Sequence, residues 1–266
     1  MRTNTVKRKL NAGEVSVGTW LTTNSALMAE ALAHQGFDWL VVDMEHSSAS
    51  FETMQHMAQA ISTTETIPMA RVAWNHPAFI KRALDMGAYG VVIPLVMNAE
   101  EARTAVRWTR YPPEGYRGVG GMRRVLYGGP DYFERANGEL LLIIQIEHVE
   151  AVGRIDEILS VPGVDAVFVG PNDLSASLGL APRMDNPDPR YEEVLRQIVE
   201  AGKRHGVATG IHCGSPAAIQ KYASWGMQFF ALSSDVGMAL QSAREGLAAL
   251  REGKPQAKGE GVAPVY

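Results

Sequence analysis

The sequence contains a single cysteine, few lysines and no long apolar segment. One cysteine excludes an internal disulfide and a zinc site built from several thiolates, so we expect a reducing, cytoplasmic setting. Apolar runs such as Leu140–Ile144 are far shorter than the roughly 20 residues of a membrane helix. The basic segment Met1–Leu10 leads into no apolar stretch, which argues against a signal peptide.

A strong charge of one sign is also missing. The 25 basic and 29 acidic residues leave a formal net charge of −4, whereas a nucleic-acid-binding domain normally has a basic face. We therefore expect small-molecule partners, with neither nucleic acid nor a membrane among them. The 266 residues are enough to bury a sizeable core.

What the sequence does contain is a regular alternation of short apolar runs with segments of helical period. Continuous apolar strands between helices are typical of a parallel sheet covered on both faces. Eight such units predict an α/β fold, a (β/α)8 or TIM barrel, as a single domain over 1–251 with a loose tail over 252–266. The predicted strands are Ser16–Leu21, Trp39–Asp43, Pro68–Val72, Gly90–Pro94, Leu140–Glu147, Ala166–Gly170, Ala208–His212 and Phe229–Ser233.

One stretch interrupts this alternation. Tyr111–Asn137 is rich in glycine and proline and poor in apolar residues. A loop of that length in a compact domain is usually functional, and we predict a lid over the site.

Carboxylates occur at the ends of two consecutive predicted strands, where barrel enzymes place their catalytic groups. Glu147 ends the fifth strand and Asp173 follows the sixth. Neighbouring strands lie about 4.8 Å apart, and two carboxylates at that spacing repel unless a cation lies between them. Oxygen ligands favour Mg²⁺ or Mn²⁺ over structural zinc. The pattern predicts a catalytic metal site.

Further polar residues follow the second and third strands. His46 comes three residues after Asp43, so this carboxylate could orient the imidazole as a general base. Arg71 could bind a carboxylate or a developing oxyanion. Structural alternatives remain for both: His46 as a hydrogen-bonding group at a helix start, and Arg71 as the ion-pair partner of Asp43 or Glu45.

Several segments together resemble the HpcH/HpaI family of metal-dependent pyruvate aldolases, which includes 4-hydroxy-2-oxoheptanedioate aldolase and 2-dehydro-3-deoxyglucarate aldolase. The resemblance extends from Val15 to Leu250. It implies a class II aldolase, a carbon–carbon lyase that reversibly cleaves a 4-hydroxy-2-oxo acid to pyruvate and an aldehyde through a metal-stabilised pyruvate enolate. The matching segments are Phe37–His46, Arg71–Asn75, Tyr111–Gly120, Gln145–Glu147 and Val167–Ser175.

The resemblance also implies individual roles. Glu147 and Asp173 ligate Mg²⁺, Mn²⁺ or Co²⁺, and Arg71 steadies the enolate oxygen. His46 is the base, with Asp43 beside it and with Asp85 raising its basicity. The substrate-contacting residues are Gln145, Gly170, Asn172 and Asp173.

Assembly and specificity follow from the same resemblance. It implies a homo-oligomer, a hexamer in the family, in which a C-terminal helix is exchanged between subunits; Val236–Leu250 is the helix in question. Asn172 and His148 depart from residues common in the family, and these differences leave the acceptor aldehyde open.

Other chemistries compete with this interpretation. A Schiff-base aldolase needs a lysine at a strand end, but all seven lysines fall in predicted helices or terminal segments. The remaining alternatives are an acyl-CoA lyase of the malyl-CoA or citramalyl-CoA type, a phosphate-binding isomerase barrel using Gly118–Gly121, and a non-enzymatic barrel. His212 has no assigned role, and we interpret Cys213 as an apolar core residue.

Overall fold

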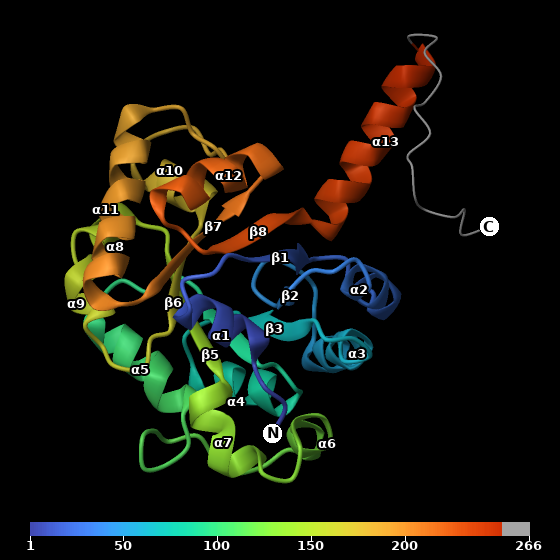
Figure 1. The fold of residues 1–266 in the computed structure, drawn as a ribbon, viewed down its shortest axis with the longest axis vertical. Helices are drawn as coiled ribbons and strands as arrows, with labels where there is room; N and C mark the ends of the chain where they lie inside the picture. Colours follow the sequence, from blue (N-terminus) through green and yellow to red (C-terminus); the bar gives the residue numbers. More distant parts are fainter. Residues whose placement is uncertain (252–266) are drawn as a thin grey trace.

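The computed structural model describes residues 1–251, and within them eight parallel strands pair in sequence order and close into a barrel (Figure 1). This confirms the predicted (β/α)8 fold. The predicted tail over 252–266 lies outside the described residues. The strands are β1 (Ser16–Leu21), β2 (Trp39–Asp43), β3 (Ile67–Arg71), β4 (Gly90–Ile93), β5 (Leu141–Ile146), β6 (Ala166–Val169), β7 (Ala208–Cys213) and β8 (Phe229–Ser234).

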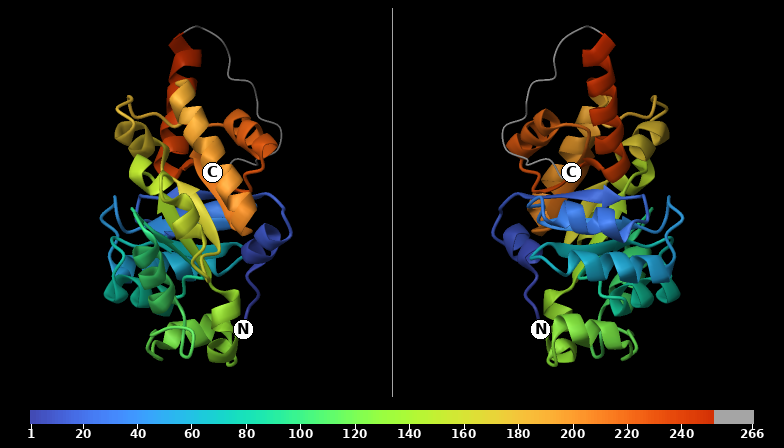
Figure 2. Two further views of the ribbon diagram at one scale, coloured as in Figure 1. Left: turned by 90° about the vertical axis from the view of Figure 1, so that its left-hand side faces the viewer. Right: turned by 90° about the vertical axis from the view of Figure 1, so that its right-hand side faces the viewer.

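Helices surround the barrel (Figure 2). The segment between β5 and β6 forms two short helices, which are separated at Gly153. The helices are α1 (Thr5–Asn11), α2 (Ala26–Ala33), α3 (Phe51–Ile61), α4 (Pro77–Asp85), α5 (Ala99–Thr109), α6 (Met122–Gly128), α7 (Tyr132–Glu139), α8 (Val149–Val152), α9 (Ile155–Leu159), α10 (Pro171–Ser177), α11 (Pro189–His205), α12 (Pro216–Trp225) and α13 (Asp235–Arg251).

The strands are apolar along their whole length because both of their faces are covered. Every residue of β2 and β5 is buried. Local signals then fix where the helices begin: Ser50 accepts a hydrogen bond from the backbone N–H of Thr53, and Asn98 does the same for Glu101. These caps reverse the chain after each strand, so the residues at the carboxyl ends of the strands face a common mouth.

The predicted lid is wrong. Tyr111–Asn137 contains α6 and most of α7 and lies between α5 and β5 (Figure 1). Its Arg117 binds Asp85 at the last residue of α4, at the end of the barrel opposite the mouth. Each barrel helix runs antiparallel to the strand before it, so the chain leaves α5 at the amino ends of the strands. The backbone N–H of Arg2, just before α1, donates to the carbonyl of Gly128 at 2.8 Å.

The last helix, α13, extends away from the barrel (Figure 1). Of its residues only Asp235 is buried, and the Asp235 carboxylate accepts hydrogen bonds from the backbone N–H groups of Thr22 and Thr23 at the end of β1. The predicted helix is therefore confirmed, and its exchange between subunits stays a prediction. No helix within residues 1–251 is long and apolar enough to cross a membrane.

Candidate active site

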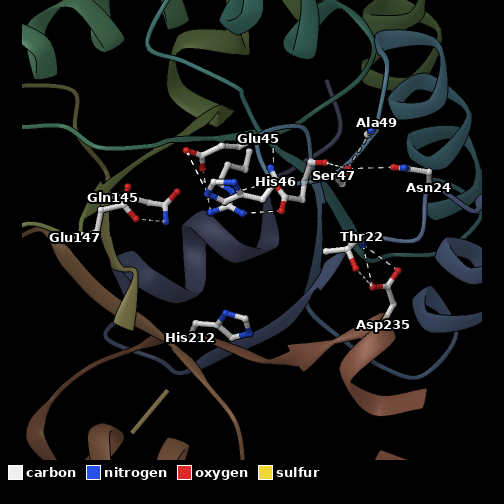
Figure 3. Close-up of polar contacts among 12 residues, drawn as sticks. Thr22, Asn24, Glu45, His46, Ser47, Ala49, Gln145, Glu147, His212 and Asp235 are labelled. Carbon is white, nitrogen blue, oxygen red and sulfur yellow. Dashed lines mark hydrogen bonds and ion pairs between the residues drawn. The ribbon is translucent and has the colours of Figure 1, made fainter. Parts of the chain in front are cut away.

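A cavity of about 250 Å³ lies at the carboxyl ends of the strands. Of the nine predicted site residues, seven line this cavity, Glu147 lies against its wall, and Asp85 is elsewhere. The seven are Asp43, His46, Arg71, Gln145, Gly170, Asn172 and Asp173. Figure 3 shows Glu45, His46, Gln145 and Glu147 gathered on one side, with His212 below them.

Arg71 is held rigidly at the end of β3. Asp43 is its directly paired neighbour on β2, and the carboxylate accepts from Arg71 Nε at 2.9 Å and from Nη2 at 2.6 Å. Glu45 Oε2 lies 3.1 Å from Nη1, and the guanidinium carbon lies 4.4 Å from the centre of the Trp20 ring. The planar guanidinium contacts carboxylates along two of its edges and stacks on an aromatic ring. These contacts fix its orientation at the cavity.

The ion pair with Arg71 determines what the Asp43 carboxylate can do. Burial alone would raise the pKa of Asp43, but the hydrogen bonds and charge of Arg71 hold it below its usual range. The predicted orientation of the His46 imidazole by Asp43 is wrong, because the Asp43 carboxylate binds Arg71 and receives only the backbone N–H of His46, at 3.2 Å. The imidazole itself is 67% exposed, with Nε2 at 3.7 Å from Glu45 Oε1.

Glu147 is the buried carboxylate of the site. Its Oε1 accepts from the backbone N–H of Leu95 at 2.8 Å, and its Oε2 accepts from Gln145 Nε2 at 3.1 Å. Burial raises the pKa of Glu147 to about 7, and the negative charges of Asp173 and Glu45 add to the shift. The ionised form of this carboxylate therefore lacks a positive partner close enough to offset its burial.

The backbone around Glu147 is shaped to admit the carboxylate. Leu95 has a positive φ of 47°, which is unusual for a bulky residue, and its N–H is the donor to Glu147. At Gly170, a Cβ would lie 2.4 Å from Glu147 Oε2, so only glycine lets the carboxylate occupy this position. Strained or side-chain-free backbone at two contacts marks Glu147 as a positioned group.

The donor set fits a hard divalent cation. Within residues 1–251 no group of three or more His, Cys, Asp and Glu side chains is arranged to hold a metal, but Mg²⁺ commonly binds through one or two carboxylates and keeps several waters. Glu147 and Asp173 supply two such carboxylates. A cation between them would also relieve the charge repulsion that raises the pKa of Glu147.

Asp85 does not join this group. It is the last residue of α4, at the opposite end of the barrel, and its Oδ1 accepts from Arg117 Nη2 at 2.8 Å. Asp85 and His46 of one chain are therefore too far apart to interact, and the prediction that Asp85 raises the basicity of His46 is wrong within a single chain. The fold separates them by the length of the barrel.

Sequence reasoning missed three contributors. Glu45 was named only as an alternative partner of Arg71, yet its charge acts on both Arg71 and Glu147. Leu95 gives no sequence signal, because its role depends on a backbone angle. His212, which ends the seventh predicted strand and was left without a role, lines the cavity.

A larger hollow lies outside the barrel, between α8, α9 and α11, with a volume of about 860 Å³. Four of its charged side chains form exposed ion pairs, Arg196 with Glu192 at 2.9 Å and Arg204 with Asp156 at 2.8 Å. None of the nine predicted site residues lines this hollow, so the barrel mouth is the candidate site.

Comparisons with known proteins agree with this position. The family model described as HpcH/HpaI aldolase/citrate lyase matches residues 16–242, a range that contains all nine predicted site residues. The chain is 41% identical over 252 residues to 2-dehydro-3,6-dideoxy-6-sulfogluconate aldolase of Pseudomonas putida, covering 94% of this chain and 97% of that protein. It is 41% identical over 251 residues to 4-hydroxy-2-oxo-heptane-1,7-dioate aldolase of Shigella sonnei, covering 92% and 94%.

Solved structures share the fold as well. The crystal structure of an HpcH/HpaI aldolase/citrate lyase family protein from Burkholderia cenocepacia superposes with a TM-score of 0.88 at 38% identity, over 94% of this chain and 100% of that chain. The similarity extends over the whole barrel, including the strand ends that carry the cavity residues.

Proposed function

Because this chain belongs to the HpcH/HpaI aldolase/citrate lyase family, we propose that its barrel mouth cleaves a 4-hydroxy-2-oxo acid to pyruvate and an aldehyde, and catalyses the reverse addition. The chain is an aldolase and hence a carbon–carbon lyase. The observation that carries the proposed site is the buried Glu147 carboxylate with its raised pKa, held against Gln145 and Gly170 of the cavity that the Arg71 guanidinium also lines.

In this proposal Glu147 and Asp173 hold a divalent metal, Mg²⁺, Mn²⁺ or Co²⁺. When bound, such an ion supplies Lewis-acid polarisation of the keto oxygen, worth several kcal/mol of charge stabilisation. The pyruvate half of the substrate then lies against Gln145, Gly170, Asn172 and Asp173, which line the same cavity.

Arg71 stabilises the negative charge that develops on the keto oxygen during cleavage. Its orientation is already fixed by Asp43, Glu45 and Trp20, so little reorganisation is needed when the charge appears. Preorganised donors of this kind typically contribute 10²–10³ in rate.

His46 is the proposed base. In the cleavage direction it takes the proton of the C4 hydroxyl, the C4 oxygen becomes the aldehyde carbonyl, and the electron pair of the C3–C4 bond forms the enolate of pyruvate. Protonation of that enolate at C3 releases pyruvate. The exposed His46 imidazole at the rim can exchange its proton with solvent between these two steps.

We also propose that the enzyme is a homo-oligomer, a hexamer with exchanged α13 helices, in the cytoplasm. The projecting α13 supports exchange, because Leu240, Leu247 and Leu250 on it are exposed. In such an assembly, Asp85 could influence His46 only from a neighbouring subunit. Mixing Asp85→Ala and His46→Ala proteins tests this: restored activity is expected, and no recovery in a mixed hexamer would contradict it.

Exchange of the pyruvate methyl protons for deuterium, followed by NMR in the absence of any aldehyde, tests the proposed chemistry. We expect exchange that EDTA abolishes, that added Mn²⁺ restores, and that borohydride leaves intact. His34→Leu, a change at an exposed site, should exchange like the wild type. Exchange that survives complete chelation, or inactivation by borohydride with pyruvate, would overturn the metal-enolate chemistry.

The alternatives find no support in the site. Gly118–Gly121, the phosphate loop of the isomerase alternative, lies before α6 at the opposite end of the barrel. The similarity to a citrate lyase β subunit from M. tuberculosis is 14% identity with a TM-score of 0.56, which shows the fold alone. The aldehyde is open, since the two relatives are named for substrates with and without a hydroxyl beyond C4.

A further inference from the structure

His212 is a cavity residue that the proposed chemistry leaves unused. It lies on β7, and its Nε2 is 2.7 Å from the carbonyl oxygen of Ser233 on the neighbouring β8. A carbonyl oxygen can only accept, so Nε2 must carry the proton of the imidazole. The neutral ring has one proton, and its Nδ1 is therefore fixed as a lone-pair acceptor.

The backbone keeps this tautomer in place. Ser233 has a positive φ of 54°, and the pairing of β8 with β1 changes register beside it. The hydroxyl of Thr19 donates to the preceding carbonyl, of Leu232, at 2.8 Å and lies 3.2 Å from the Ser233 carbonyl oxygen. The carbonyl that locks His212 is thus itself held at a strained position, a feature typical of functional sites.

The other ring nitrogen faces the cavity. Figure 3 shows the His212 ring with one nitrogen directed toward β8 and the other toward the space below Gln145 and His46. Nδ1 has no hydrogen-bond partner among the residues that the structure describes. Burial, reinforced by the charge of Arg71, lowers the pKa of His212 to about 4, so the ring stays neutral at pH 7.

An aromatic ring lies beside the imidazole. The Trp20 ring lies 5.8 Å from the imidazole, centre to centre, and Trp20 packs in turn on Phe168. A neutral acceptor in this position can bind a hydroxyl donor, and its lone pair repels a carboxylate. Its ligand is a group that brings its own proton.

Pyruvate offers no such group. Its keto and carboxylate oxygens are acceptors only at neutral pH, so a fixed acceptor has nothing to bind on that half of the substrate. The proton donors are the hydroxyls of the aldehyde-derived half. With its low basicity, His212 is also a poor choice for removing the proton of the C4 hydroxyl.

We propose that His212 Nδ1 accepts a hydrogen bond from a hydroxyl beyond C4 and so selects hydroxylated aldehydes over unsubstituted aliphatic ones. The inference rests on the proposed function and specifies its aldehyde class. His212 is a specificity-determining residue of the acceptor half, distinct from Arg71, Glu147 and Gln145 around the pyruvate half.

Two aldehydes with the same number of carbons test the inference. The kcat/KM for addition of pyruvate is measured with glyceraldehyde and with propanal, for the wild type and for His212→Leu. We expect the wild-type ratio of glyceraldehyde to propanal to fall about tenfold in His212→Leu, the effect of one hydrogen bond to a neutral acceptor. His212→Asn, whose Oδ1 can replace Nδ1, should recover part of the ratio.

The ratio is insensitive to how much protein folds, and His34→Leu, the same replacement at an exposed position, should leave it unchanged. An unchanged ratio in His212→Leu would overturn the inference. If the ratio is unchanged because kcat/KM falls equally for both aldehydes, His212 acts on the shared C4 hydroxyl instead. Failure of the proposed function is seen separately, as absence of pyruvate methyl exchange in the wild type.

Discussion

The two ends of the barrel differ in how their charged side chains are paired. At the amino ends of the strands, α1 is attached through Lys7, whose Nζ lies 2.9 Å from Asp165 Oδ1. Arg110 Nη2 lies 2.8 Å from Asp165 Oδ2, and the backbone N–H of Leu142 donates to the same oxygen at 2.7 Å. Two cations share one carboxylate in this group, but each charge is in direct contact with a partner of opposite sign.

At the carboxyl ends the acids outnumber their partners. Asp43 and Glu45 share Arg71, while Glu147 receives only neutral donors. Gln145 Oε1 is buried there with no hydrogen-bond partner among the described residues. Burying a polar group without a partner costs free energy, and at this end the group that bears the cost, Gln145, lies directly beside Glu147. The division matches the general rule that a barrel's function lies at the carboxyl ends and its stability at the amino ends.

Replacing Glu147 by Gln is the strongest test of this division. The amide keeps the size of the side chain but cannot carry the negative charge that holds a cation. We expect kcat/KM for aldol cleavage to fall by about 10³ or more, with the thermal midpoint unchanged or raised. Glu150→Gln, an exposed neighbour on α8, is the matched control and should retain activity. An active Glu147→Gln enzyme would remove Glu147 from the site.

The opposite end should give the opposite result. Asp165→Asn leaves Lys7 and Arg110 without their partner, and these side chains are only 14% and 4% exposed. We expect the free energy of unfolding to fall by about 3 kcal/mol in urea denaturation, because breaking a buried pair strands the remaining charge. Activity per folded molecule should be retained. Glu100→Gln, from an exposed pair with Arg103, should change stability by less than about 1 kcal/mol.

Apolar period and strand polarity predicted the barrel and the strand ends, while Gln145, Gly170 and Asn172 came from the family resemblance. Contacts that depend on pairing across strands were not decided. Asp43 was assigned to His46, its neighbour in sequence, with an ion pair to Arg71 only as an alternative, whereas the register of β2 and β3 puts Asp43 beside Arg71. The alternation of side chains along one strand does not specify the register between neighbouring strands.

The lid was misplaced for a related reason. The lid over Tyr111–Asn137 was inferred from its length and composition alone, but the segment follows α5, which carries the chain to the other end of the barrel. Its glycines and prolines therefore shape the closed amino end. α1 gave no signal in the sequence, since its seven residues have only Val6 and Leu10 buried.

Arg71→Lys sharpens the comparison within the mouth. A lysine keeps the charge but loses the planar fork that Asp43 and Glu45 grip, and it cannot stack on Trp20 in the same way. We expect kcat to fall about 10²-fold with a smaller change in KM, because the lost interaction forms mainly in the transition state. Arg107→Lys, in an exposed pair with Glu100, is the control. A rise in KM with kcat unchanged would instead assign Arg71 to ground-state binding.

The smallest expected effect is on the pH dependence of stability, and it tests whether the ionised Glu147 carboxylate destabilises the fold. Burial raises the pKa of Glu147 from 4.5 to about 7, so between these values the unfolded chain has lost a proton that the folded protein keeps. The stabilisation is complete below about pH 4.5 and is lost as pH rises through 7.

In EDTA, the free energy of unfolding of the wild type relative to Glu147→Gln should fall by about 2 kcal/mol from pH 4.5 to 8. Urea denaturation of both proteins across this range measures the difference. A flat or rising difference would mean that the Glu147 carboxylate is already stabilised by the protein alone. With Mn²⁺ the slope should weaken, since ligands bind metal in their deprotonated form. A carboxylate that destabilises the empty fold and stabilises the loaded one is a ligand, and Asp165 at the opposite end should show no such dependence on metal.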